Sequence, residues 1–304
     1  MKPLGDAAHL NVDGARVAIT TDSFVVKPLR FPGGSIGGLA VNGTVNDLAV
    51  SGARAEAMVV TFVLEAGLAT EILHSEIHAM ADAAEQAGVR IVGGDTKVVE
   101  HGKADLMYIS STGIGSPIEG VVVDPASVRP GDKILVSGPI GDHGITILLA
   151  RGELDLEAEL TSDTRSVLPL VEVIAGACAP SIRWMRDPTR GGLATALNEL
   201  ARDCGHGVAI SEEAVPMRDA VRGACELLGL EPLHIANEGQ FLAVVSPDAA
   251  EKALAALRQT PGGEEARIIG EILEQPAGTV LATTRYGSSR IVDMLVGDPL
   301  PRIC

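Results

Sequence analysis

Apolar residues recur with two different periods along this chain, and the two periods predict its secondary structure. Between residues 69 and 87 they stand three to four positions apart, which is the spacing of an amphipathic helix, and Gly88 ends the pattern. Short apolar runs between glycine, proline or polar residues predict strands, which are expected first at 17–22, 57–64, 89–92 and 106–113. With a helix of small residues at 39–51, this order predicts a first α+β unit. The polar residues 1–16 and the glycine-rich residues 31–38 are expected to be irregular.

The same alternation starts again after a turn at 128–132, Val-Arg-Pro-Gly-Asp. Helices are expected here at about 142–151, 164–178, 193–204, 217–228 and 249–259. Strands are expected at 133–137, 182–185, 208–211, 241–245 and 268–271, and as a hairpin at 280–284 and 291–295. The fold class that we predict is α+β, with one domain at 1–127, a second at 128–296 and a tail at 297–304.

The charge and hydropathy of the chain exclude some classes of partner. Forty acidic residues against 24 basic ones give a net charge of −16, so nucleic acid is not an expected partner. No apolar run reaches the ~18 residues of a membrane span and no signal peptide precedes the first strand, so we expect a cytoplasmic protein without a membrane partner. Of the four cysteines, Cys178, Cys204 and Cys225 form no C-x-x-C pair and are expected to be buried apolar side chains on helices.

The fourth cysteine, Cys304, is the last residue of the sequence and follows two closely spaced prolines. Prolines remove backbone donors and favour extended geometry, so we expect neither a helix nor a central strand at 297–301. Eight extended residues reach roughly 26 Å, which would make 297–304 a mobile arm with a sulfur nucleophile at its tip. Arg302 would favour the thiolate, whereas the terminal carboxylate would oppose it. An ordinary frayed terminus that ends in cysteine is the alternative.

Four aspartates share a context that suits metal binding. Asp22, Asp47, Asp95 and Asp187 each stand at the end of a strand or in a short loop beside glycine, threonine or asparagine. Carboxylates in such places can converge on a hard cation, and Mg²⁺ in proteins takes a few carboxylates together with phosphate oxygens. The glycines let the backbone approach a phosphate closely, although the sequence contains neither a Walker loop nor a Rossmann turn. A turn former or a helix N-cap is the alternative for each aspartate taken alone.

Lys97 and Glu238 stand among small or polar residues at strand margins and are candidates for an acid–base pair, with surface charges as the alternative. His74 and His78 are one helical turn apart, but the intervening Glu76 is one place off the H-E-x-x-H pattern, so a solvent-facing pair is expected. For His143, in an expected loop, the sequence indicates no role.

Several motifs taken together resemble a known family, the HypE hydrogenase maturation factors, over essentially the whole chain. They are TTDSFVV at 20–26, FPGG with GTVNDLAVSGA at 31–53, GGDTKVV at 93–99, RDPTRGGLATALNELA at 186–201, NEG at 237–239 and PRIC at 301–304. PRIC combined with GGDTKVV and RDPTRGG is specific to this family. Looser versions of the acidic motifs occur across the wider AIR synthase (PurM-like) superfamily, which includes selenophosphate synthetase and thiamine-monophosphate kinase, and these relatives lack the terminal cysteine.

The resemblance implies a two-domain PurM-like fold and a homodimer joined through the N-terminal domains, with ATP bound near that interface. It also implies an ATP-dependent carbamoyl dehydratase activity. Cys304 would receive a carbamoyl group from the partner HypF, and ATP would phosphorylate the carboxamide oxygen. Loss of phosphate and protons would then leave a thiocyanate, whose cyano group would pass to the iron of a [NiFe] hydrogenase on the HypC–HypD complex.

The matching motifs also imply roles for single residues. Cys304, Lys97 and Glu238 would be catalytic, with Lys97 as the cation near the phosphorylated oxygen and Glu238 as the base. ATP and Mg²⁺ would be bound by Asp22, Asp47, Gly94, Asp95, Thr96, Asp187 and Asn198, of which Asp22, Asp47 and Asp187 would hold the metal. The resemblance departs at the N-terminus, because family members usually carry a glycine-rich segment there that this sequence lacks. If that segment helps to cover ATP, we expect weaker binding or closure.

Two other functions remain open on the sequence alone. One is another ATP-using enzyme of the superfamily with an ordinary tail, and the other is a non-catalytic thiol carrier or iron-site scaffold. The terminal cysteine argues against the first, and the acidic glycine-rich motifs argue against the second. If the chain is a dehydratase, we expect the four aspartates to converge on one nucleotide, partly across a dimer interface. We also expect Lys97 to meet Glu238 in a cleft between the domains.

Overall fold

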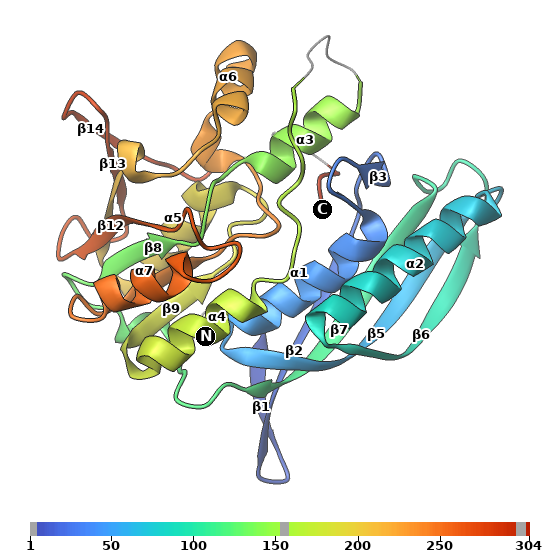
Figure 1. Ribbon diagram of the computed structural model, residues 1–304, viewed down its shortest axis with the longest axis horizontal. Coiled ribbons are helices and arrows are strands. Elements are labelled where there is room, and N and C mark those ends of the chain that lie inside the picture. The colour runs from blue at the N-terminus through green and yellow to red at the C-terminus, as the bar shows by residue number, and fades with distance from the viewer. Residues whose placement is uncertain (1–4, 153–157, 296–301) are drawn as a thin grey trace.

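A five-stranded sheet is the base of the first of two α+β units (Figure 1). The structure is a computed structural model that describes residues 5–152, 158–295 and 302–304. The strand order is β1-β2-β7-β5-β6, and every neighbouring pair is antiparallel except β5 and β6. The strands are β1 (Ala8–Val12), β2 (Ala15–Phe24), β5 (Ala53–Glu65), β6 (Arg90–Val99) and β7 (Met107–Pro117).

Helices α1 (Ile36–Val50) and α2 (Thr70–Ala87) cover one face of this sheet (Figure 1). The small residues of α1 allow the two helices to approach closely, because a Cβ atom on Gly37 would lie only 2.1 Å from the backbone oxygen of Glu76 on α2. The other face of the sheet and its β6 edge keep large apolar side chains exposed. These are Val59, Ile91, Val92, Val98 and Ile114.

A seven-stranded sheet forms the second unit, in the order β14-β13-β10-β12-β8-β11-β9. Its strands are β8 (Lys133–Val136), β9 (Ile182–Arg186), β10 (Gly207–Ser211), β11 (Leu242–Val245), β12 (Arg267–Leu273), β13 (Val280–Thr283) and β14 (Ser289–Ile291). Side chains alternate along β8: Ile134 and Val136 join the apolar cluster beneath α5, whereas Leu135 joins the cluster that includes α4 and α7. Both faces of this sheet are therefore buried.

Among the described residues, five helices and four short 3₁₀ segments complete the second unit and its connections. The helices are α3 (Asp142–Ala150), α4 (Leu168–Cys178), α5 (Gly192–Cys204), α6 (Asp219–Leu228) and α7 (Ala250–Arg258). The 3₁₀ segments are η1 (Pro125–Ser127), η2 (Ala179–Ser181), η3 (Glu212–Ala214) and η4 (Pro232–His234). Within the described ranges, no helix combines the length and the apolar character that a membrane crossing requires.

The two units share one apolar cluster, which runs from the helices of the first sheet to α4 and α7 of the second. A buried polar side chain also joins them. Asn46 on α1 donates hydrogen bonds from Nδ2 to the backbone oxygens of Arg165 at 2.9 Å and Glu238 at 3.2 Å. Its Oδ1 accepts one from the Val167 amide at 2.8 Å. The junction between the units is therefore closely packed and hydrogen-bonded.

Two stretches that the sequence predicted to be irregular are ordered. Residues 8–24 form a hairpin of β1 and β2, whose turn uses positive φ angles at Asp13 (51°) and Gly14 (86°). Residues 31–38 contain most of a small hairpin, β3 (Arg30–Phe31) with β4 (Gly34–Ser35), and the first turn of α1. The GGDTK motif lies inside β6 rather than after a strand, and the helix expected from 164 begins at Leu168. The pattern failed for β1 because all of its side chains are exposed, so no apolar alternation marks it.

Candidate functional site

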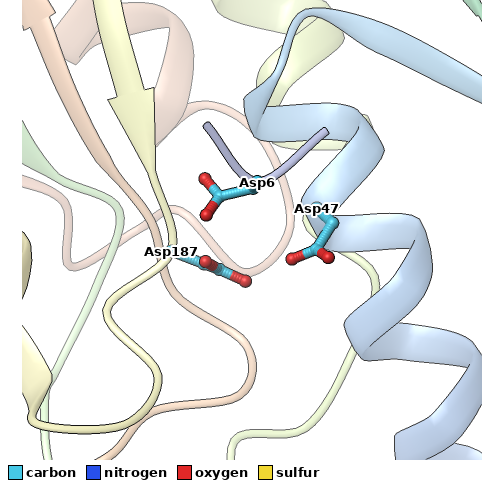
Figure 2. Close-up of side chains that lie close together, drawn as sticks. All are labelled: Asp6, Asp47 and Asp187. Atoms are coloured by element: carbon cyan, nitrogen blue, oxygen red, sulfur yellow. The ribbon is translucent and has the colours of Figure 1, made fainter. Parts of the chain in front are cut away.

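Three aspartate side chains from distant parts of the sequence meet at the junction of the two units. Asp6 precedes β1, Asp47 lies on α1 and Asp187 follows β9. One carboxylate oxygen from each lies within 4.8 Å of the other two. Figure 2 shows the three carboxylates gathered around one shared space. Carboxylate oxygens grouped in this way are the ligands that Mg²⁺ prefers.

Burial and mutual repulsion oppose the ionisation of these aspartates. Burial is the largest cause that raises the pKa of Asp187 to about 6, although the Arg186 charge lowers it. The pKa values of Asp6 and Asp47 lie well above their ordinary range, because of burial first and of the Asp187 charge second. Arg186 Nε lies 2.9 Å from Asp6 Oδ1. This one positive charge does not balance three carboxylates, so the cluster keeps an excess of negative charge when all three are ionised. A hard divalent cation would relieve the repulsion, so the residues present fit Mg²⁺.

Asp22 lies beside this cluster rather than in it. It is on β2, and its charge raises the pKa of both Asp47 and Asp187. Its Oδ1 accepts a hydrogen bond from the Ser23 amide at 2.7 Å. The structure thus brings together two of the three residues expected to hold the metal and adds Asp6. No signal in the sequence pointed to Asp6, because no motif surrounds it.

The last three residues of the chain are docked in their own subunit. The amide of Val25 donates to the oxygen of Cys304 at 2.8 Å, and the amide of Lys27 donates to the oxygen of Arg302 at 3.2 Å. Ile303 pairs with Val26 in a β-bridge and is 2% exposed. Most of the tail expected to be mobile, from 297 to 301, lies outside the described residues, but Arg302–Cys304 are part of the folded structure.

The docked position leaves Cys304 half-buried in a mostly acidic environment. Arg190 Nη2 lies 3.7 Å from Cys304 Sγ. Burial is the largest cause that raises the pKa of Cys304 to about 12, the Glu238 charge raises it further, and Arg190 lowers it. Arg302 was expected to favour the thiolate, but its guanidinium contacts Asp105 at 3.2 Å instead. The docked thiol is therefore protonated at neutral pH.

Glu238 is an acid near this thiol, and its side chain is only 3% exposed. Burial raises the pKa of Glu238 well above its ordinary value, and the charges of Asp187 and Asp163 raise it further. Its Oε1 is buried and has no hydrogen-bond partner among the described residues. A buried carboxyl group left without a partner is a marker of function, since burial without a hydrogen bond costs free energy.

The loop that carries Glu238 is fixed on both sides. The Asp163 carboxylate accepts hydrogen bonds from the backbone amides of Glu238 and Gly239, each at 3.1 Å. The side-chain amide of Asn237 donates to the backbone oxygen of Pro188 at 2.9 Å. A Cβ atom on Gly239 would lie 1.8 Å from the backbone oxygen of Asp163, so only glycine fits. In the NEG motif the asparagine and glycine therefore shape the loop, and the glutamate is free to react.

Four expected site residues lie elsewhere, on the exposed edge strand β6. They are Gly94, Asp95, Thr96 and Lys97. Asp95 is the register partner of Thr61 on β5. Thr61 is in turn paired with Ser110 on β7, and Ser110 with Ser23 on β2. Because paired residues share a face and neighbours along a strand alternate, Asp95 and Asp22 point to opposite faces of the sheet.

The charges on β6 are satisfied locally. Lys97 Nζ lies 2.5 Å from Asp95 Oδ2, and both side chains are largely exposed. A Cβ atom on Gly94 would lie 1.9 Å from the backbone oxygen of Val60, so close strand pairing explains this glycine without a phosphate. Within one subunit, therefore, Lys97 does not meet Glu238 in a cleft, and the four aspartates do not share one site. The convergence of the four aspartates across a dimer interface stays a prediction.

Asn198 lies on α5, where it has a structural role. Its Nδ2 donates to the backbone oxygens of Ala194 and Val292, both at 2.8 Å. Both amide hydrogens are thus used within the second unit, and a nucleotide contact of Asn198 stays a prediction.

Asp163 and His143 are two further residues near the site that the sequence did not indicate. Asp163 stands in no motif. His143 lies in the first turn of α3, not in a loop, and its Nε2 is 2.6 Å from the backbone oxygen of Ile303 in the docked tail. A signal was present for His143, because a glycine before Asp142 is typical of a helix start.

Known proteins resemble this chain along nearly its whole length. Residues 4–116 match the N-terminal domain, and residues 129–282 the C-terminal domain, of AIR synthase related proteins. The carbamoyl dehydratase HypE of Azotobacter vinelandii is 48% identical over 299 residues, which cover 98% of this chain and 87% of that protein.

Two crystal structures share its architecture. One, of the hydrogenase maturation protein HypE in complex with ATP, has a TM-score of 0.91 at 45% identity and covers 99% of this chain and 90% of that one. A chain of the crystal structure of a HypE–HypF complex has a TM-score of 0.91 at 45% identity, covering 96% of this chain and 93% of that one. These likenesses confirm the two-domain, PurM-like α+β fold that the sequence predicted.

Proposed function

Because the chain belongs to the HypE family of carbamoyl dehydratases, we propose that it converts an S-carboxamide on Cys304 into an S-thiocyanate at the expense of ATP. The reaction removes the elements of water from the carboxamide and uses them to convert ATP to ADP and phosphate. The cyano group then becomes a cyanide ligand of the iron in a [NiFe] hydrogenase.

The docked thiol is the observation that carries this proposal. Cys304 Sγ lies inside the subunit, close enough to Glu238 for the carboxylate charge to act on the thiol. A carboxamide on that sulfur would lie beside the buried side chain of Glu238.

Glu238 is suited to remove protons from the carboxamide nitrogen. Formation of a nitrile requires two N–H bonds to break, and a general base works best when its pKa lies near the working pH. Burial raises the pKa of Glu238 in that direction. Its unpartnered Oε1 is available to accept a proton.

Asp6, Asp47 and Asp187 would hold Mg²⁺, with Asp22 next to them. When bound, Mg²⁺ would neutralise charge on the phosphates of ATP. The Asp187 charge also acts on Glu238, so the proposed metal site and the base lie close together. This neighbourhood is where the carboxamide oxygen has to be phosphorylated.

We further propose that the enzyme is a homodimer in which β6 serves the partner's site. The uncovered face of the first sheet exposes Val59 and Ile114, and an apolar patch of this kind marks an interaction surface. Asp95 and Lys97 project from the same face. A second copy on this face would supply Lys97 as the cation near the phosphorylated oxygen, and Gly94, Asp95 and Thr96 as nucleotide contacts.

The partners follow from the same chemistry. A related chain has been crystallised in a HypE–HypF complex. We propose that HypF loads the carbamoyl group onto Cys304 here, and that the HypC–HypD complex accepts the cyano group. Since the last three residues are hydrogen-bonded to the body of the protein, the tail has to leave its site before each exchange.

Intact-mass measurement tests the proposal. The protein is incubated with carbamoylated HypF, with and without ATP. Without ATP the mass should rise by one carbamoyl group, and ATP should then lower it by one water. A protein that never gains the carbamoyl mass, or that keeps it unchanged with ATP, would contradict the proposed reaction.

A further inference from the structure

His143 is a buried residue that contacts the docked tail directly. Its Nε2 is 2.6 Å from the backbone oxygen of Ile303, and its Nδ1 is 2.8 Å from Ser162 Oγ. Its ring meets Phe31 edge-on, with centroids 5.6 Å apart. Both ring nitrogens are therefore used, one for the protein interior and one for the tail.

These contacts define the tautomer of the ring. A backbone oxygen only accepts hydrogen bonds, so Nε2 carries the proton that is donated to Ile303. Ser162 Oγ accepts the Thr164 amide at 3.1 Å and is left to donate its own hydrogen to Nδ1. The imidazole is then neutral, in agreement with burial, which lowers the pKa of His143 to about 4.

His143 fixes the side of the tail that the other contacts leave free. The carbonyls of Arg302 and Cys304 accept the backbone amides of Lys27 and Val25. The Ile303 carbonyl instead accepts a hydrogen bond from His143. The side chain of Ile303 lies close to Gly144, where an added Cβ atom would come within 3.3 Å of Ile303 Cδ1. A tail shifted by one residue would lose both contacts.

The residue that holds His143 and the residue that holds the loop of Glu238 are neighbours in the sequence. Ser162, which holds the imidazole, directly precedes Asp163, which holds the amides of Glu238 and Gly239. One short segment therefore positions both the tail and the loop of the base.

We propose that His143 is a positioning residue for the dehydration: through the Ile303 carbonyl it sets the depth at which the tail docks and so holds the sulfur of Cys304 beside Glu238. The catalytic part of this inference rests on the proposed function, whereas the docking part does not. His143 itself does not touch the reacting atoms.

A matched pair of substitutions separates the hydrogen bond from simple packing. His143→Gln keeps an N–H donor at a similar reach, and His143→Met fills a similar volume without one. Iodoacetamide labelling of Cys304 in the unloaded protein is followed by intact mass, with Cys304→Ser as the blank. His143→Met should label roughly ten-fold faster than the parent, the factor expected for one lost buried hydrogen bond, and His143→Gln should stay close to the parent.

A second measurement follows the reaction itself. In a single turnover of protein already loaded with carbamoyl, His143→Met should form thiocyanate roughly ten-fold more slowly, and His143→Gln should recover most of the rate. Carbamoyl loading, which uses the undocked tail, should not be slowed in either variant. A role in packing alone would affect both variants equally, together with their melting temperatures.

The possible results divide clearly. If both variants protect Cys304 as well as the parent does, or expose it equally, the inference is wrong. If His143→Met does not fold, Ser162→Ala replaces it, because it removes the group that sets the tautomer. Labelling of Ser162→Ala at the parent rate would also overturn the inference. If the parent never loads a carbamoyl group, the proposed function fails, while the labelling comparison still tests the docking.

Discussion

Asp47 and Asp95 stand in sequence motifs of similar composition, but their surroundings in the structure are opposite. Asp47 lies half-buried beside Asp6 and the buried Asp187 at the junction of the two units. Asp95 lies exposed on β6 and is paired with Lys97. The difference arises because Asp47 is on α1, which covers one face of the sheet, whereas the side chain of Asp95 points from the uncovered face. The dimer proposed above would account for this difference, because a second copy would bring its Asp95 and Lys97 to the acidic cluster.

Replacement of the Cys304 sulfur should have the largest effect on the proposed reaction. Cys304→Ala should lose carbamoyl loading completely and keep its fold, because the thiol contributes one long contact to Arg190. Intact mass after incubation with carbamoylated HypF measures this. Cys204→Ala on α5, far from the tail in sequence, is the control and should load like the parent. Carbamoyl mass on the Cys304→Ala protein would contradict the carrier assignment.

Removal of the base should stop the second step only. Glu238→Gln keeps the shape of the side chain but cannot accept the proton, so loading should be normal and thiocyanate formation should fall by about 10²–10⁴-fold. A single-turnover mass time course measures both steps. Glu251→Gln, on the exposed side of α7, is the control. Dehydration at the parent rate in Glu238→Gln would require another base.

Mixing two inactive variants tests whether Lys97, on the exposed strand β6, acts in the site of a second copy. Lys97→Ala should slow the dehydration while ATP still binds, because the cation acts on the phosphorylated oxygen. Mixed dimers of Lys97→Ala with Glu238→Gln would contain one site with both residues intact. Equal mixing and exchange should therefore restore roughly a quarter of the parent rate. No recovery after exchange would mean that Lys97 does not act across subunits.

The smallest expected effect concerns the stability of the cluster without metal. The folded pKa of Asp187 is about 6, above its ordinary 3.8, so its contribution to the free energy of unfolding falls as the pH rises through this range. One pKa unit corresponds to about 1.4 kcal/mol, so the ionised group costs up to about 3 kcal/mol above pH ~6. Asp187→Asn should therefore be more stable than the parent at about pH 7.5 in EDTA, with no gain at about pH 4.

Mg²⁺ should reverse that order. It binds the folded parent and should raise its melting temperature at about pH 7.5, and the Asp187→Asn protein should respond less. Denaturant unfolding at both pH values, with Mg²⁺ or EDTA, makes the comparison. An equal response of the two proteins to Mg²⁺ would exclude Asp187 as a ligand.

The sequence predicted those parts of the molecule in which local pattern and burial agree. The helix at 69–87 was placed to within one residue, because its apolar stripe packs on the sheet. β1 was missed because an exposed hairpin needs no apolar alternation. The face on which Asp95 lies depends on strand register, which arises from pairing with β5 and β7 and not from the motif itself. Asp6 could not be predicted, since only the folded hairpin brings it to Asp47 and Asp187.

The amide of Asn46 has a consequence for how the protein moves during its cycle. Opening the two units about a hinge would break three buried hydrogen bonds and split a shared apolar cluster, whereas withdrawal of the tail breaks contacts of only three described residues. The first costs far more free energy than the second, since each buried polar group left unpaired costs about 1–3 kcal/mol. Local release of a chain end is faster than a domain motion, which takes microseconds to milliseconds. On these contacts the two units stay joined as one body, while a single short peptide can leave and return.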